Sequence, residues 1–281
     1  MDKNKEDIYD RINSKIDADE TVIRMRGNRK RLRFGYSAAA CIAVLCMIAT
    51  YQVGLRSQGG EPQQTEVELR VPYGILSEMT LPDGTRVVLN GGSRLTYSTP
   101  FGAERQVYLS GGGFFDVAKD EKHPFTVHSK NVSARVLGTR FAFNAYESDL
   151  YTVLTLEEGC VEALLSNEDM KKESILLTPA QQLVLDNHTG EFQRKNVNTA
   201  EYTSWKDGIL HFRGETLHEI AVILERRFDV KIHVLTKEIG NDGYVAQFKY
   251  GENVEQILDK LSYKRSWKYA KREDGIEISE R

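Results

Sequence analysis

The sequence lacks the patterns that mark most enzymes and nucleic-acid-binding proteins. Its 38 Lys and Arg residues are balanced by 41 Asp and Glu residues, so no overall basicity favours nucleic acid. Three cysteines cannot all pair within one chain, which excludes a disulfide scaffold. The six histidines never fall into zinc-ligand spacing, and no GxxxxGK or GxSxG motif occurs. We therefore expect no catalysis, no cofactor, no metal and no direct contact with nucleic acid.

Long apolar runs are also scarce, and only one could cross a membrane. The 22 uncharged residues from Phe34 to Leu55 would form a helix about 33 Å long, against about 30 Å for a hydrocarbon core. A cleaved signal would lie nearer the N-terminus and end in small residues. A buried soluble helix stays the alternative, because Ser37, Thr50 and Gln52 make the run only moderately apolar. We predict a transmembrane helix over residues 34–55.

The charges around this run predict its orientation. Six basic residues precede it within ten positions, whereas only two follow it closely, at Arg56 and Arg70. Such a cluster could bind phosphate groups, but before an apolar run it more often marks the cytoplasmic flank of a membrane segment. We therefore expect residues 1–33 in the cytoplasm and everything beyond the span outside it. The preceding basic residues are Arg24, Arg26, Arg29, Lys30, Arg31 and Arg33.

The expected cytoplasmic segment, residues 1–33, carries one apolar stripe. At helical spacing the stripe is too small to bury itself, so it must lie on a membrane or pack on a partner. The many acidic residues around it argue against an anionic lipid surface and favour a protein partner. The stripe consists of Ile8, Tyr9, Ile12, Ile16, Val22 and Ile23.

A polar linker, residues 56–66, separates the span from a β-rich region over residues 67–196. Short alternating runs are separated by turn residues such as Pro82-Asp83-Gly84, and no amphipathic helix interrupts them. This pattern predicts a mainly β fold, an antiparallel sandwich or roll. The triplet Gly111–Gly113 has no phosphate-loop context, and we interpret it as a turn.

Residues 199–281 contain an internal repeat with an offset of 37 residues. GETLHEI, starting at Gly214, matches GENVEQI, starting at Gly251. Thr216 and Asn253 are expected to cap two helices, each with one apolar face and with a strand before and after it. The repeat predicts a small α+β domain of two βαβ-like units, with both helices on one face of a single sheet and with open sheet edges. The expected apolar faces are Leu217, Ile220 and Leu224, and Val254, Ile257 and Leu261.

The β region resembles the periplasmic FecR domain. The resemblance runs from LPDGTRVVLNGGSRLTYSTPF through RQVYLSGGGFFDVAKDEKHPFTVHS and ARVLGTRFAFNAY to LEEGCVEAL and LTPAQQ. The end of the chain, from Trp205 through HEIAVILERRFDVKI, is similar to the C-terminal domain that accompanies FecR in Bacteroidetes-type members, itself similar to small signalling domains of secretins and TonB-dependent transducers.

The resemblance implies a single-pass sensor or anti-sigma factor of the inner membrane, with its C-terminal domains in the periplasm. Its partners would be an extracytoplasmic-function sigma factor in the cytoplasm, a TonB-dependent outer-membrane transducer, and membrane proteases that complete release. Our hypotheses are that the sigma factor contacts Ile8, Ile12, Ile16 and Ile23, and that the transducer contacts Leu210, Phe212, Val245 and Phe248. The alternative is an anchored carbohydrate- or ligand-binding module that uses Tyr97, Phe101 and Tyr108.

Overall fold

The computed structural model describes residues 47, 48, 50, 51, 64–102, 104–165, 173–235, 243–249 and 251–281. Residues 64–281 form one compact unit, separate from residues 1–63. Among the residues described, no helix is both long enough and apolar enough to span a membrane. The predicted cytoplasmic segment lies outside these residues, as does nearly all of the predicted span.

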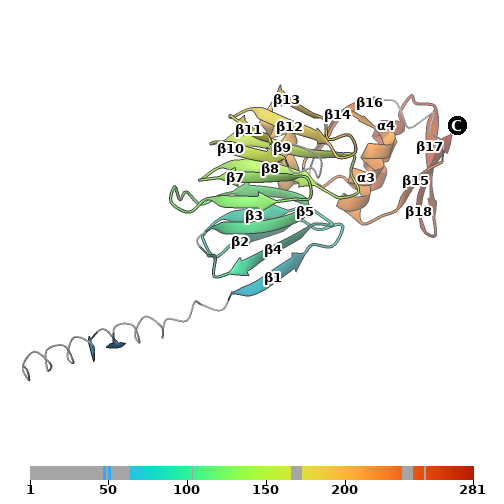
Figure 1. Cartoon of the computed structure of the whole chain (residues 1–281). Coiled ribbons are helices and arrows are strands. Elements are labelled where there is room, and N and C mark those ends of the chain that lie inside the picture. Colours follow the sequence, from blue (N-terminus) through green and yellow to red (C-terminus); the bar gives the residue numbers. More distant parts are fainter. Residues whose placement is uncertain are drawn as a thin grey trace, which may run out of the picture. The chain divides into compact units, whose positions relative to one another are not determined.

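The first part of the compact unit, residues 64–196, is called the β part here. Its strands belong to one sheet that curls on itself, and Figure 1 shows them stacked from β1 to β13. This confirms the mainly β prediction. The strands are β1 (Thr65–Arg70), β2 (Ser77–Thr80), β3 (Arg86–Leu89), β4 (Arg94–Thr99), β5 (Arg105–Asp116), β6 (Phe125–His128), β7 (Val132–Val136), β8 (Arg140–Ala145), β9 (Tyr151–Glu158), β10 (Val161–Leu165), β11 (Glu173–Leu177), β12 (Gln181–Asp186) and β13 (Phe192–Asn196).

The long strand β5 makes the sheet curl, because its two halves pair with different neighbours. Its first half pairs with β4 and, in parallel, with β6, whereas its second half pairs with β3 and β8. From β6 the sheet continues through β7 and β10 to β11, and from β8 through β9 and β12 to β13. The enclosed core contains apolar residues from most of the strands, such as Leu95, Phe115, Phe141 and Leu183.

The glycine triplet lies inside β5, where the strand passes from one half of the sheet to the other, so the predicted turn is wrong. Gly111 has a φ of +124°, and a Cβ atom there would lie 2.5 Å from the Ser93 hydroxyl oxygen. Only glycine fits this backbone and this close approach. The triplet therefore marks a crossover between sheet halves.

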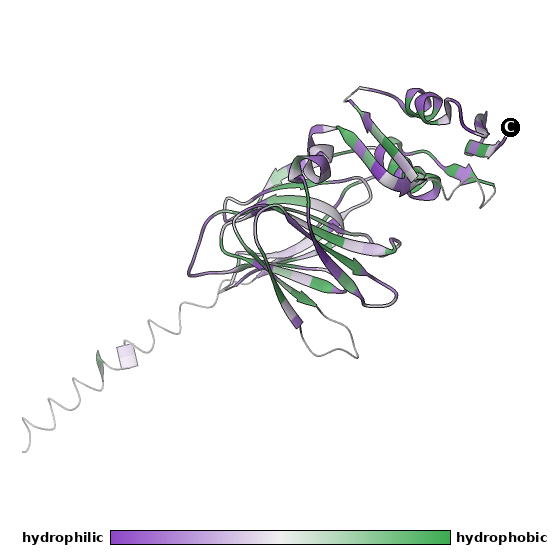
Figure 2. Cartoon of the chain, turned by 90° about the horizontal axis from the view of Figure 1, so that it is seen from above, coloured by the Kyte–Doolittle hydropathy of each residue, from purple (hydrophilic) through white to green (hydrophobic). Residues whose placement is uncertain are grey.

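The C-terminal part, residues 199–281, has its own core. Figure 2 shows apolar and polar stretches alternating along its strands and around its helices. The expected apolar faces of α3 and α4 are all buried in this core, which confirms that prediction. The elements are α2 (Thr199–Thr203), the 3-10 helix η1 (Ser204–Asp207), β14 (Leu210–Thr216), α3 (Leu217–Phe228), β15 (Ile232–Val234), β16 (Gly243–Phe248), α4 (Val254–Ser262), β17 (Trp267–Arg272) and β18 (Gly275–Glu280).

Both helices of the repeat begin with the predicted caps. The Thr216 hydroxyl accepts a hydrogen bond from the Glu219 amide, and the Glu219 carboxylate accepts one from the Thr216 amide. Asn253 and Gln256 form the same reciprocal pair at the start of α4. These capping boxes satisfy amides that a helix start leaves without partners.

The strands of the repeat do not form the single sheet that we expected. The first strands of the two units, β14 and β16, pair with each other in antiparallel fashion. The second strands lie in another sheet of order β15-β18-β17, in which β15 is parallel to β18. Local apolar periodicity indicates which face of a strand is buried, but it does not indicate which strand pairs with which.

Candidate functional site

Of the four residues expected to contact a transducer, the structure exposes one fully. Phe212 and Phe248 are 1% and 3% exposed, and their ring centroids lie 5.7 Å apart in the core. Leu210 is partly buried against the same core. Val245, in contrast, is 86% exposed. The Phe212 and Phe248 side chains therefore hold the fold together, and Val245 is the surface residue of the set.

Val245 lies on a strand with a free edge. In the part of the chain that the structure describes, β16 pairs only with β14. The orientation of β16 is fixed by Tyr244, whose hydroxyl accepts a 2.7 Å hydrogen bond from Trp267 Nε1 in the core. Because side chains alternate along a strand, Tyr244 inward places Val245 outward. A free edge beside an exposed apolar side chain is a site where a partner strand can add.

The helix α4 and the strand β17 are held together near the second sheet by polar contacts. The Tyr269 hydroxyl donates a 2.7 Å hydrogen bond to Asp259 Oδ1. Burial and this carboxylate raise the pKa of Tyr269 to about 12. Lys271 pairs with Glu255 at 2.5 Å, and this lysine lowers the pKa of Glu255. These two contacts hold α4 against β17.

The LPDGT motif of the β part has a structural role. Asp83 accepts hydrogen bonds from the Thr85 amide at 3.0 Å and from the Thr85 hydroxyl at 2.7 Å. It also accepts a 2.8 Å hydrogen bond from Arg105 Nη1. Arg105 is buried and donates further bonds to the carbonyls of Ala118 and His123, each at 2.9 Å. This buried pair ties the β2–β3 turn to the start of β5.

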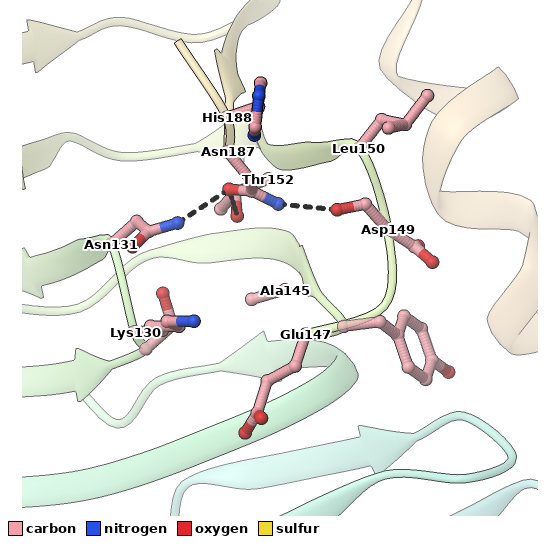
Figure 3. Close-up of a pocket in the computed structure, with 11 residues that line it drawn as sticks. Lys130, Asn131, Ala145, Glu147, Asp149, Leu150, Thr152, Asn187 and His188 are labelled. Atoms are coloured by element: carbon pink, nitrogen blue, oxygen red, sulfur yellow. Dashed lines mark hydrogen bonds between the residues drawn. The ribbon is translucent and has the colours of Figure 1, made fainter. Parts of the chain in front are cut away.

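One pocket of about 220 Å³ opens on the β part. Figure 3 shows Asn187 held by residues from two other chain segments, one at Asn131 and one that runs from Asp149 to Thr152. Its Oδ1 accepts bonds from Asn131 at 2.9 Å and Thr152 at 2.7 Å, and its amide donates to the Asp149 carbonyl at 2.9 Å. The pocket is smaller than the 300–1,000 Å³ or so of typical ligand sites.

The aromatic residues of the carbohydrate alternative are mostly buried. Tyr97 belongs to the core, and Phe101 packs against that core. Only Tyr108 is well exposed, at 55%, and its ring stacks on His128 with centroids 4.9 Å apart. Within the described residues, no group of three or more His, Cys, Asp or Glu side chains is placed to hold a metal ion.

Two family models match the chain. The model described as FecR protein matches residues 68–162, and the model described as FecR, C-terminal matches residues 209–278. The chain belongs to the FecR family. The two matched ranges fall in the β part and in the C-terminal part, so both parts of this FecR chain have family counterparts.

Two crystal structures resemble this FecR chain over most of its length. Each is described as "a putative anti-sigma factor" from Parabacteroides distasonis, and each matches with a TM-score of 0.71. One is 30% identical, and the match covers 76% of this chain and 99% of that one. The other is 29% identical, with 77% and 100% covered. A search of curated proteins found no match.

Proposed function

We propose that the chain is a single-pass inner-membrane anti-sigma factor and sensor. In this proposal residues 1–33 bind an extracytoplasmic-function sigma factor, residues 34–55 span the membrane, and residues 64–281 receive a periplasmic signal. The observation that carries the proposal is the 30% identity to a structure described as "a putative anti-sigma factor", over 99% of that chain. A regulator acts by binding partners, and the free edge of β16 provides a surface on which one partner can bind.

The proposed signal comes from a TonB-dependent outer-membrane transducer. The free edge of β16 supports this part of the proposal, because a strand from a partner's signalling domain can pair there without any rearrangement of the core. Val245 then contacts a side chain of the added strand. Membrane proteases complete the release of the sigma factor, and the regulated genes are those for uptake of the transducer's ligand.

The proposed sigma-factor contact is the apolar stripe of the cytoplasmic segment. Changing both Ile12→Asp and Ile16→Asp places two charges in the stripe, and a buried unpaired charge opposes packing on a partner. We expect the sigma factor to co-purify with the tagged full chain and to be lost with the double variant. The matched control is Asp10→Asn with Asp17→Asn, which changes charge beside the stripe. Undiminished recovery with the Ile12 and Ile16 variant would contradict the proposal.

A further inference from the structure

Arg226 lies on the face of α3 opposite to the C-terminal core. It lies nine positions after Leu217. At about 3.6 residues per turn this is two and a half turns, so the two side chains point in opposite directions. Leu217 is buried in the C-terminal core, yet Arg226 is only 6% exposed. A helix buried on two opposite faces has two packing partners. The second partner of α3 is the β part.

The Arg226 guanidinium binds the β8–β9 loop. Its Nη1 donates a 2.9 Å hydrogen bond to Asp149 Oδ2, and its Nη2 donates to Asp149 Oδ1 and, at 3.0 Å, to the Ser148 hydroxyl. The guanidinium carbon lies 3.6 Å from the centroid of the Tyr146 ring. A bidentate pair that is also stacked fixes both the distance and the orientation of the two parts. Figure 3 shows Asp149 on this loop, at the rim of the pocket.

The backbone at Arg226 also touches two further loops of the β part. Its carbonyl oxygen accepts a 2.9 Å hydrogen bond from the Gly74 amide. The same oxygen would lie 2.4 Å from a Cβ atom at Gly91. Tyr146 joins this contact by donating a 2.7 Å bond to the Gly91 carbonyl. A side chain at Gly91 would push α3 away, and Gly74 has a φ of +80°, which favours glycine.

These two loops lead directly to the first strand of the compact unit. The loop that contains Gly74 begins where β1 ends, and Val71 in that loop exchanges 2.8 and 2.9 Å hydrogen bonds with Ser93 and Gly92 of the β3–β4 turn. Within the described residues β1 pairs only with β4. Residues 1–63 join the compact unit at β1. Arg226 therefore contacts the loops that adjoin the end of β1, the first strand of the compact unit.

The Arg226–Asp149 ion pair fixes the position of α3 on the β part more than it stabilises the fold. Replacing a buried ion pair by apolar groups often costs little, whereas removing one partner alone is costly, so such pairs fix a geometry. Arg226 Nε is buried and has no hydrogen-bond partner, so the contact is only partly satisfied. A buried donor without a partner costs free energy, so the contact is less favourable than a fully satisfied one would be.

We propose that Arg226 is a latch through which the C-terminal part controls β1. With the latch closed, α3 holds the loops at Gly74 and Gly91 and thereby the end of β1. When a bound partner moves the C-terminal part, α3 included, away from the β part, Arg226 leaves Asp149 and the end of β1 loosens. The direction of this signal rests on the proposed function, whereas the coupling between α3 and β1 is a property of the fold alone.

Hydrogen exchange of the full chain in detergent, read by mass spectrometry, tests the coupling. In Arg226→Met we expect exchange in residues 65–75 to rise by about fivefold or more, the lower end of usual couplings between sites. Exchange in β17 and β18 should stay as in the wild type, which shows that the C-terminal part is folded. The matched control is Arg227→Met, the same change one position along α3.

Coupling between two sites is reciprocal, so a change in the β part must also change hydrogen exchange in α3. Gly91→Ala leaves both ion-pair partners in place, and we expect it to speed exchange in the last turn of α3 by a similar factor. Unchanged exchange in residues 65–75 of Arg226→Met, or in α3 of Gly91→Ala, would overturn the latch. Neither result would bear on sigma-factor recovery with the Ile12 and Ile16 variant, so the two proposals fail separately. If Arg226→Met does not fold, Asp149→Asn opens the latch from its other side and is read in the same way.

Discussion

Asp83→Ala is expected to lower the free energy of unfolding of residues 64–281 by about 3–5 kcal/mol, the cost of leaving one partner of a buried ion pair alone. The substitution leaves the Arg105 guanidinium, whose side chain is 5% exposed, without its carboxylate. It also removes the acceptor of two bonds from Thr85, which shape the β2–β3 turn. Urea unfolding followed by circular dichroism measures the effect.

Two control variants separate the effect of losing the negative charge from the effect of losing the hydrogen bonds that shape the turn. Asp83→Asn keeps a side-chain oxygen for Thr85 but removes the negative charge, so its loss should be smaller than that of the alanine variant. Glu68→Ala breaks an ion pair with Arg70 that is well exposed, and such pairs contribute little because solvent screens them. Equal losses of unfolding free energy in Asp83→Ala and Glu68→Ala would show that the buried Asp83–Arg105 pair stabilises the fold no more than an exposed pair does.

Val245→Lys is expected to weaken docking on the β16 edge, reducing the affinity for the partner by about tenfold or more, or about 1.4 kcal/mol. A lysine on an edge strand opposes the addition of another strand, and natural proteins use it for that purpose. Because Val245 is so exposed, the fold itself should be unaffected. The measurement is the affinity of the full chain for the purified N-terminal signalling domain of the transducer.

The matched control for this variant is Leu235→Lys, directly after β15. Leu235 is another exposed aliphatic residue of the C-terminal part, but it lies on the other sheet. Its substitution should leave the affinity unchanged. Full binding by Val245→Lys would move the docking site away from β16, and equal losses in both variants would indicate a nonspecific charge effect.

Local structure could be predicted well because its causes are local. Thr216 and Asn253 stand three residues before Glu219 and Gln256, and this spacing alone specifies a capping box. Strand pairing could not be predicted in the same way, since β14 and β16 lie about thirty residues apart and periodicity does not encode their contact. Gly111 was misread because a triplet of glycines is more typical of a turn than of a strand that changes sheets.

The candidate site was predictable only in part. Alternation along YVAQF indicates that Tyr244 and Phe248 share one face while Val245 lies on the other, so the exposed residue of the set could have been singled out. Arg226 gave no such signal. An arginine in the last turn of a helix usually satisfies the helix dipole at the surface, and only the tertiary contact with Asp149 shows a different role.

Transcript profiles of cells that lack the chain test the central claim, control of a sigma factor by this protein, most directly. Cells complemented with the wild-type chain are compared with cells that carry the Ile12→Asp and Ile16→Asp variant at the same membrane level. The proposal predicts that the wild type restores the transcript levels of one sigma-dependent gene set, and that the variant leaves them as in the deletion. Identical profiles for the wild type, the variant and the deletion would contradict it.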